Sequence, residues 1–439
     1  MNKIIFHIDV NSAFLSWSAV KILKEDPDAL DLRTIPSAVG GDVKTRHGII
    51  TAKSIPAKKY GIQTAMPVVK AIQLCPKLVL VESDFKTYRE YSHAFIDILH
   101  KYTPLVQQVS IDEAFIDLTG TELLYKHLET EKEKFPLSVA TAIRNEIRDT
   151  LGFTVNVGIS SNKLLAKMAS DFKKPDMTHT LFPEEIEKKM WPLPIGDLYG
   201  CGKATSQRLI SLGMRTIGDV ARSDEAFLKQ VLGEKGGAYI YASANGHGSD
   251  IVENEYEDAK SYSNETTIPT DISIENYDNQ VPDIVRWLSD KVSSRMRNAG
   301  VYGSTITVSV KTGNFKRHSI QTGITDPTNS SDVIYETAMQ LMDKLMKGPQ
   351  GLFYKDETIR LIGVGASNLD NGEYRQMSLF DVMPASGQSN VSSSSGSNLT
   401  RPVISNEKRE KLDAMTDLIK KEFGKNAIVR GSNLDNNNK

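Results

Sequence analysis

Three acidic residues stand inside short apolar runs that otherwise have the composition of buried β-strands. Asp9 lies near the end of a run that begins after Lys3, and Asp112 and Glu113 interrupt a second run that ends at Phe115. Because burying an unpaired charge is costly, such strands seldom carry carboxylates without a positive partner. Acids from two distant strands therefore predict that the strands meet around a cation. Hard divalent ions such as Mg²⁺ are held by one or two carboxylates together with substrate phosphates.

The spacing of apolar residues predicts a mixed α+β order in the first 175 residues. Residues 3–10 alternate like a strand, and Asp9 lies near the end of the face that does not enter the core. Asp112 and Glu113 are neighbours, so they can serve one site only at a hairpin tip or a strand start. Further elements are expected at 12–24 (helix), 37–52 (hairpin), 53–76 (short helices), 88–102 (helix), 140–151 (helix), 154–159 (strand) and 162–172 (helix). This order allows a ferredoxin-like sheet but does not prove it.

Residues 176–369 are expected to form a helical region, a linker and a second α+β unit. Residues 176–248 are helical and polar, and an acidic linker follows at 249–258. A second α+β unit is expected from residue 259 to 369. Its predicted strands are 305–311 and 358–364, and its predicted helices are 281–298 and 331–347.

The last 70 residues have the composition of a flexible tail. Residues 385–398 are rich in Ser, Gly and Asn, which is typical of disordered segments. A short amphipathic helix is expected at 406–423, between an N-cap at Ser405 and a terminator at Gly424. Its expected apolar face consists of Leu412, Met415, Ile419 and Phe423. Docking on the protein and binding to a partner both remain open for this helix.

Composition excludes several classes of protein. A length of 439 residues predicts several domains, and the net charge of −2 shows no global bias toward nucleic acid. The two cysteines, Cys75 and Cys201, are far apart, which argues against disulfides and zinc and fits a reducing cytoplasm. Asp9 interrupts the apolar N-terminal run, and no other run is long enough to span a bilayer. We expect a cytoplasmic protein with no membrane contact.

Four motifs together resemble those of the Y-family (translesion) DNA polymerases, in the bacterial DNA polymerase IV and UmuC-like branch. They are Asp9, the segment Ser110–Ala114, the segment Val157–Lys163 and the turn Gly200–Gly202. They occur in the family's order, and the similarity extends from residue 1 to about 368. Each motif alone is weak, but the ordered set is specific.

The resemblance implies a multidomain α+β fold, the right-hand polymerase. Its parts are a ferredoxin-like catalytic palm, small fingers, a helical thumb with a helix-hairpin-helix, an α+β little finger and a flexible C-terminal tail. Carried onto this chain, they are 1–12 and 83–175 (palm), 13–82 (fingers), 176–248 (thumb), 249–258 (linker), 259–369 (little finger) and 370–439 (tail).

The resemblance also implies template-dependent addition of deoxynucleotides to a primer 3′ end by two-metal nucleotidyl transfer. Asp9 and Asp112 would bridge two Mg²⁺ ions, with the backbone carbonyl of Val10 as a further ligand. Glu113 would complete the primer-side site. The expected role is low-fidelity translesion synthesis in DNA repair or damage tolerance.

The resemblance places the nucleotide at two segments and one lysine. Phe14 stands where the family has an aromatic steric gate against the ribose 2′ hydroxyl, although a core phenylalanine of an amphipathic helix is the alternative. Ile55 and Lys58 replace a Tyr and an Arg of the family, which removes one hydrogen bond and one bidentate contact. The full set of expected nucleotide-binding residues is Asn11, Ser12, Ala13, Phe14, Ala52, Ile55, Lys58 and Lys163.

Expected DNA contacts lie in the thumb and the little finger. Gly200, Gly202 and Lys203 form a glycine-rich turn whose backbone N–H groups can approach a phosphate, although such turns are common between helices. Lys311, Lys316 and Arg317 are expected to contact phosphates along the duplex, and a solvated hairpin is the alternative.

A short motif in the tail predicts a protein partner. Gln376, Leu379 and Phe380 match the peptide that binds the bacterial sliding clamp (the β subunit), in which two apolar anchors fill a pocket. The expected partners are therefore primer–template DNA, deoxynucleoside triphosphates and this clamp, with the chain acting as a monomer.

Two other interpretations compete with the polymerase. A nucleotidyl cyclase shares a ferredoxin-like core and metal-binding carboxylates, but it lacks a thumb hairpin and a clamp peptide. A DNA-binding or clamp-binding scaffold with weakened catalysis is favoured by the changes at Ile55 and Lys58 and opposed by the three intact acids.

Overall fold

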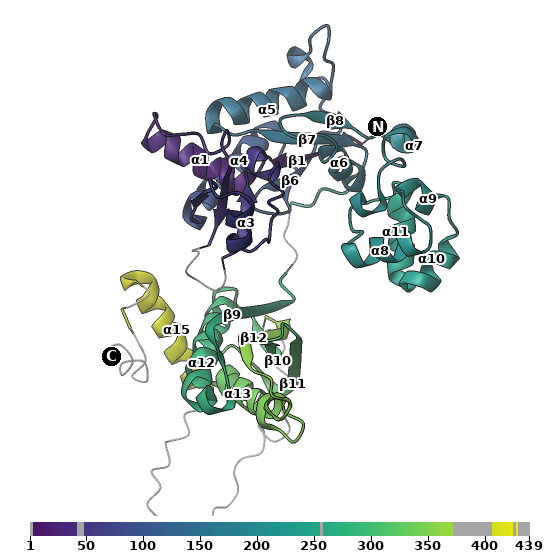
Figure 1. Ribbon diagram of the computed structural model, residues 1–439. Helices are drawn as coiled ribbons and strands as arrows, with labels where there is room; N and C mark the ends of the chain where they lie inside the picture. The colour runs from purple at the N-terminus through teal and green to yellow at the C-terminus, as the bar shows by residue number, and fades with distance from the viewer. Residues whose placement is uncertain (1–2, 42–47, 255–257, 372–405, 425–426, 429–439) are drawn as a thin grey trace, which may run out of the picture. The chain divides into compact units, whose positions relative to one another are not determined.

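The protein forms two compact units, and we describe each by itself. The computed structural model describes residues 3–41, 48–254, 258–371, 406–424 and 427–428 (Figure 1). Unit 1 is Met1–Tyr256, and unit 2 is Glu257–Lys439.

The main sheet of unit 1 has the strand order β5-β6-β1-β7-β8 among the described residues. Strand β1 is central and antiparallel to both β6 and β7. This is the ferredoxin-like arrangement that the sequence allowed, with β8 added in parallel to β7. The strands are β1 (Ile5–Val10), β5 (Val106–Gln108), β6 (Glu113–Asp117), β7 (Val155–Ser160) and β8 (Thr178–Thr180).

Helices cover both faces of this sheet. Phe6, Ile8 and Val10 of β1 belong to the large core that includes residues of α4 (Phe85–Tyr102) and α5 (Leu137–Leu151). The other face of β1 lies under α6 (Lys163–Ser170). Gly158 on β7 permits this close crossing, because a Cβ there would lie 2.0 Å from the Ala166 carbonyl oxygen.

A smaller sheet is inserted between β1 and α4. Its order is β3-β2-β4, and β2 and β3 form the predicted antiparallel pair. Its core packs beside the long helix that follows β1. The elements are α1 (Ala13–Glu25), β2 (Ser37–Gly40), β3 (Ile50–Lys53), α2 (Ile55–Lys58), α3 (Val68–Leu74) and β4 (Val79–Val81).

The C-terminal part of unit 1 is helical, as its polar composition predicted. Its core cluster includes Met190, Leu209 and Ile240. The turn at Gly200–Gly202 follows a single 3₁₀ turn rather than the expected full helix. The elements are η2 (Pro183–Glu185), α7 (Ile186–Lys189), η3 (Ile195–Asp197), α8 (Lys203–Ser211), α9 (Ile217–Ala221), α10 (Glu225–Leu232) and α11 (Glu234–Ala244). One further 3₁₀ turn, η1 (Lys126–Leu128), lies earlier in the chain, between β6 and α5.

Unit 2 is a sheet with the strand order β11-β10-β12-β9 and two long helices packed against it. All three strand pairs are antiparallel. The sequence predicted β10, β12 and both helices but not the strands β9 and β11, whose residues are mostly polar. The elements are β9 (Ser261–Ile272), α12 (Ile274–Asn298), β10 (Tyr302–Thr312), β11 (Arg317–Thr328), α13 (Ser331–Lys347), η4 (Leu352–Lys355) and β12 (Ile359–Asp370).

The predicted tail helix is present as α15 (Asn406–Phe423), and it lies against α12. It docks through acids: Asp413 is buried and accepts a hydrogen bond from the Ser331 backbone N–H at 2.8 Å. Leu412, Met415 and Phe423 are instead 61–71% exposed.

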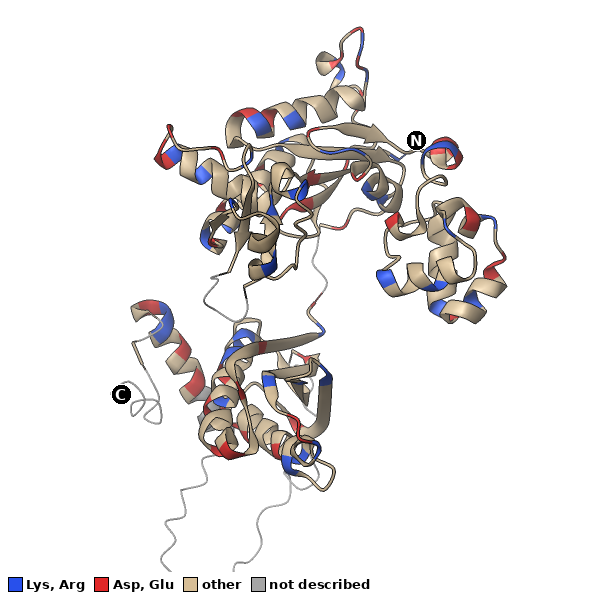
Figure 2. Cartoon of the chain, in the orientation of Figure 1, with Lys and Arg blue, Asp and Glu red and all other residues tan. Residues whose placement is uncertain are grey.

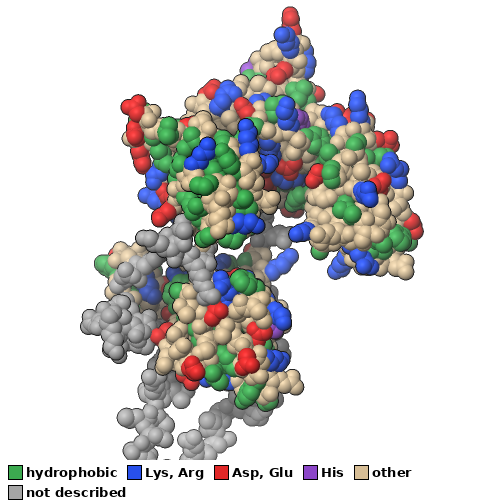
Figure 3. All heavy atoms as spheres, in the orientation of Figure 1, with side chains coloured by type: hydrophobic (Ala, Val, Ile, Leu, Met, Phe, Trp, Pro, Cys, Tyr) green, Lys and Arg blue, Asp and Glu red, His purple; other side chains and the backbone are tan. Residues whose placement is uncertain are grey.

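Charge is mixed across both units. Lys and Arg residues are interspersed with Asp and Glu in Figure 2, and the face in Figure 3 carries the same mixture. A charged site is therefore a local feature. Of the helices that the structure describes, none is both long enough and apolar enough to span a bilayer.

Candidate active site

The register of the main sheet places two of the three predicted acids opposite each other, and the third lies on the adjoining turn. Asp9, near the end of β1, is directly opposite Glu113, the first residue of β6. The backbone N–H of Val10 donates to the carbonyl oxygen of Asp112 at 3.0 Å. Asp112 lies in the turn before β6, so the strict alternation of a strand does not separate it from Glu113.

Two lysines that the sequence did not single out pair with these acids. Lys167 Nζ lies 2.8 Å from Glu113 Oε1 and 3.4 Å from Asp9 Oδ2. Lys174 Nζ lies 2.8 Å from Asp9 Oδ1. Asp171 joins both lysines, at 3.6 Å from Lys167 and 2.9 Å from Lys174.

One of these lysines had a signal in the sequence. Lys167 is one helical turn beyond Lys163 in an otherwise apolar helix, so it faces the same sheet. Lys174 follows the helix, before Pro175, and no periodic pattern marks it.

Burial and charge act on the acids in opposite directions. Burial raises the pKa of Asp9 to about 6, although the ammonium groups of Lys174 and Lys167 act to lower it. The neighbouring His7 ring and a hydrogen bond from Lys167 hold the pKa of Glu113 well below its usual range. Burial acts to lower the pKa of Lys167, but its carboxylate partners, Glu113 first, raise it overall.

His7 is buried behind the acids. Its Nδ1 lies 2.8 Å from the Ser170 hydroxyl, and its Nε2 lies 3.6 Å from Glu113 Oε2. Burial lowers the pKa of His7. The ring therefore packs the back of the site, between the sheet and α6.

The chemistry of the site fits divalent cations, although no ready-made metal cage exists. No three His, Cys, Asp or Glu side chains among the described residues are placed to hold an ion. The ammonium of Lys167 nevertheless lies within reach of both Asp9 and Glu113, so a cation position exists between these two carboxylates. Asp112 Oδ1, held by the Ser110 hydroxyl at 2.7 Å, adds a further hard oxygen donor on the neighbouring turn.

The expected nucleotide-binding residues of the first segment form the β1–α1 turn. Ser12 has φ 50° and is the N-cap of α1, and the Asn11 backbone N–H donates to the Thr154 carbonyl oxygen. Ala13 is buried. Phe14 is partly buried and stacks on Tyr88, with ring centroids 4.7 Å apart. Its ring is thus packed against another aromatic ring, five residues beyond Asp9 in the sequence.

The second expected nucleotide segment lies in the smaller sheet. Ala52 is nearly buried on β3, whereas Ile55 and Lys58, at the two ends of α2, are exposed. Burial and the nearby charge of Lys58 lower the pKa of Lys53. Two cations therefore stand close together here.

Lys163 lies on the same face of the sheet as the acids but does not pair with them. Its Nζ donates to Gln107 Oε1 at 3.1 Å and lies 6.0 Å from the centre of the Phe115 ring. Phe115 is two residues beyond Glu113 on β6.

The two glycines of the turn at residues 200–202 have different surroundings. Gly200 has φ +85°, and a Cβ there would lie 2.5 Å from the Tyr239 ring. Gly202 is the N-cap of α8, has no atom within 4 Å of a built Cβ, and is followed by the exposed Lys203.

In unit 2, the predicted basic residues surround the β10–β11 turn. Lys311 is opposite Arg317 in the register, and Lys316 is exposed in the turn. Arg317 pairs with Glu265 at 2.5 Å. Gln376, Leu379 and Phe380 lie outside the described residues.

Residues 8–171 match the impB/mucB/samB family, and residues 259–379 match the C-terminal domain of that family. Residues 196–248 match a description of the DNA polymerase iota thumb domain. A DNA polymerase IV of Clostridium acetobutylicum is 36% identical over 439 residues, which is 100% of both chains. DNA polymerase IV 1 of Bacillus subtilis is 32% identical, over 99% of this chain and 94% of its own.

A solved Y-family DNA polymerase chimera shares the fold, with a TM-score of 0.67 at 24% identity. The match covers 83% of this chain and 98% of the chimera. Together with full-length relatives above 30% identity, it replaces the cyclase and scaffold interpretations. The chain belongs to the Y family of DNA polymerases and is a DNA-directed DNA polymerase, which extends primer–template DNA with deoxynucleoside triphosphates.

Proposed function

We propose that this polymerase extends primers by a two-metal reaction at Asp9, Asp112 and Glu113, and that it serves low-fidelity translesion synthesis. The observation that carries the proposal is the pairing of Asp9 with Glu113 across β1 and β6, with one ammonium within reach of both. Two Mg²⁺ ions bound by these acids and the Val10 carbonyl would activate the primer 3′ hydroxyl and stabilise the leaving pyrophosphate.

The lysines of the site have a separate role in this proposal. Lys167 and Lys174 neutralise Asp9 and Glu113 in the metal-free protein and thereby reduce the repulsion between these two carboxylates. When a divalent cation takes over these oxygens, both ammonium groups keep Asp171 as a partner and can bind a further anion. A triphosphate is the anion that the reaction brings to the site.

The rest of the nucleotide contacts follow from the turn and the smaller sheet. Phe14, stacked on Tyr88, would exclude a 2′ hydroxyl by filling the space beside the sugar. Lys58 and Lys163 would bind phosphate, with Asn11, Ser12, Ala13 and Ala52 lining the site and Ile55 adding no hydrogen bond.

Duplex binding would use both units without reading sequence. The backbone N–H groups of the Gly200–Gly202 turn and the Lys203 side chain would contact one phosphate stretch. Lys311, Lys316 and Arg317 would contact another. The family's parts would then be assigned as palm 1–12 and 83–175, fingers 13–82, thumb 176–248 and little finger 259–369.

The decisive test of the reaction is primer extension with Mg²⁺ by the full chain and by Asp112→Ala. We expect extension by the intact chain and its loss by at least roughly a thousandfold in the variant, because a metal ligand is removed. Asp97→Ala, which removes an exposed acid of α4, is the matched control and should keep full activity. Activity in Asp112→Ala close to that of the control would contradict the assignment.

A further inference from the structure

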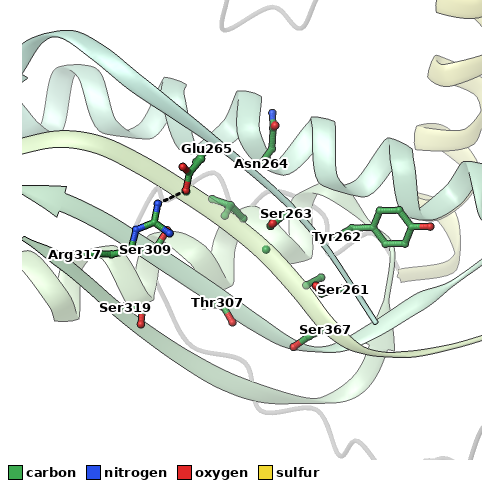
Figure 4. Close-up of a pocket in the computed structure, with 14 residues that line it drawn as sticks. Ser261, Tyr262, Ser263, Asn264, Glu265, Thr307, Ser309, Arg317, Ser319 and Ser367 are labelled. Carbon is green, nitrogen blue, oxygen red and sulfur yellow. Dashed lines mark hydrogen bonds and ion pairs between the residues drawn. The ribbon is translucent and has the colours of Figure 1, made fainter. Parts of the chain in front are cut away.

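The sheet of unit 2 leaves one face open and almost free of large side chains. Its helices α12 and α13 pack on the other face, which holds Ile306, Val308 and Val364. Glycine, serine and threonine follow one another across the open face in register, for example Ser263, Gly365 and Thr307. A pocket of about 390 Å³ lies on this face (Figure 4).

One ion pair crosses this open face. Arg317 comes from β11 and Glu265 from β9, the two edge strands of the sheet, and their side chains meet at 2.5 Å (Figure 4). Two inner strands separate them, so both side chains must reach over Gly363 and Ser309. A Cβ on Gly363 would lie 2.5 Å from the Ser309 hydroxyl and 3.2 Å from Glu265 Cβ, so the small residues make room for the pair.

Arg317 of this ion pair is one of the three basic residues that the proposed function assigns to DNA phosphate. Lys311 stands opposite Arg317 in the register, and Lys316 precedes it in the turn. Of these three cations, Arg317 has the planar fork that suits a bidentate oxygen acceptor, whether carboxylate or phosphate. In the structure, this fork is turned inward to the carboxylate of Glu265.

We propose that Glu265 is an internal competitor for DNA: it occupies Arg317 in the free protein, and a phosphate must displace it. The proposal rests on the proposed function, because it presumes that the open face of unit 2 meets the duplex. Glu265 thereby sets the DNA affinity of unit 2 below the value that its cations alone would give. It also makes Arg317 available only when a phosphate is close enough to compete.

The exposure of the pair sets the size of the effect. The side chains of Arg317 and Glu265 are 51% and 47% exposed, so solvent screens their attraction. Half-exposed pairs of this kind are weak enough to exchange partners. The cost of displacing Glu265 from Arg317 lowers the DNA affinity of the wild type by about two- to five-fold. The effect is a tuning of affinity rather than an on–off switch.

The test is a double-mutant cycle on the full chain, with equilibrium binding to a fluorescent primer–template at several KCl concentrations. The variants are Glu265→Gln, Arg317→Gln and the two combined. Glu265→Gln should tighten binding by about two- to five-fold. It should also steepen the salt dependence by up to about 0.9 in the logarithmic slope, the value of one phosphate contact, because Arg317 is then unpaired before DNA binds. In the Arg317→Gln background, the same change should have little effect.

Each other outcome overturns the inference. An equal gain from Glu265→Gln in both backgrounds would mean general repulsion by a negative charge, and weaker binding would mean that Glu265 positions Arg317 for DNA. No effect of Arg317→Gln in either background would mean that no phosphate reaches it. Glu275→Gln, at an exposed acid on α12, is the control for loss of charge, and thermal unfolding checks that each variant is folded.

The outcome is independent of the catalytic test. If the cycle shows no coupling while Asp112→Ala abolishes primer extension, the competition is wrong and the proposed reaction stands. If Asp112→Ala retains full activity, the proposed reaction is wrong whatever the cycle shows.

Discussion

Lys167 and Lys174 give Asp9 and Glu113 a positive partner when no divalent ion is bound. Asp9 is 8% exposed, so its carboxylate is unfavourable without a cation near it. The ammonium of Lys167 lies between two acids that a metal site would also use. Ion pairing and metal binding therefore compete for the same oxygens.

This competition predicts how Lys167→Met changes the stability of the protein with and without Mg²⁺. Removing the ammonium leaves two acids without their shared partner, and we expect the free energy of unfolding at pH 8 in EDTA to fall by roughly 2 kcal/mol. Mg²⁺ should restore part of the loss, because it can take the vacated position. Urea unfolding with and without Mg²⁺ measures both effects. A loss that Mg²⁺ leaves unchanged would show that Lys167 does not mark a cation position.

The pKa of Asp9 predicts a pH dependence in metal-free protein. Its folded pKa of about 6 lies above the ordinary value of 3.8, so the folded state binds more protons between these values. Stability from this group is therefore present below about pH 4 and is lost as the pH rises through 6. Relative to Asp9→Asn, the wild type should lose roughly 2–3 kcal/mol between pH 4 and pH 7. Parallel stability curves for the two proteins in EDTA would contradict a raised pKa.

At the scale of secondary structure, the tail helix shows that an amphipathic pattern does not fix which face is buried. Asp413 of α15 accepts hydrogen bonds from the backbone N–H and hydroxyl of Ser331, at the first turn of α13. It therefore caps a helix whose own N-cap, Ser330, makes no side-chain capping bond. Arg297 joins Asp413 and Asp417 from α12.

These contacts predict that acids rather than apolar residues hold α15. Asp413→Ala should raise the hydrogen-exchange rates of α15 amides at least tenfold and lower the stability of unit 2 by about 1–2 kcal/mol, because a buried cap is lost. The matched control is Leu412→Ala, whose side chain is 61% exposed. Faster exchange in the control than in Asp413→Ala would show that the apolar face is the docking face.

The elements that the sequence predicted best are those with one consistent period. The helix at 331–347 was predicted with the bounds that α13 has, and β1 and the acid-bearing turn lie where alternation and its interruption placed them. Strands β9 and β11 escaped prediction because their open faces carry small polar and charged residues, so no apolar alternation appears. Lys174 escaped because its contact with Asp9 depends on how the chain leaves α6, which tertiary packing decides.

At the scale of the whole molecule, the described contacts divide the chain into two compact units, and the domain bounds that the resemblance implies stay a prediction. Residues 13–248 lie within unit 1, so the proposed fingers and thumb share one compact unit with the catalytic sheet. The boundary near residue 256 falls inside the predicted linker at 249–258. The proposed catalytic residues and the proposed contacts of the little finger thus lie in different compact units of one chain.

The tail motif predicts a partner at this scale. Deleting residues 376–380 should leave distributive primer extension intact and abolish its stimulation by the bacterial sliding clamp, because Leu379 and Phe380 would be the apolar anchors. Extension of a singly primed circular template, with and without the clamp, measures both properties. Stimulation equal to that of the intact chain would mean that another segment binds the clamp. Sedimentation of the chain alone tests the expected monomer.

The central claim is that Asp9, Asp112 and Glu113 together hold divalent cations. Its most direct measurement is the number of Mn²⁺ ions bound per chain, by electron paramagnetic resonance, in the complex with a 3′-deoxy primer–template and a deoxynucleoside triphosphate. We expect two bound ions for the intact chain and a loss of at least one for Asp112→Asn, with no change for the control Asp97→Asn. Equal stoichiometry in the intact chain and Asp112→Asn would contradict the claim.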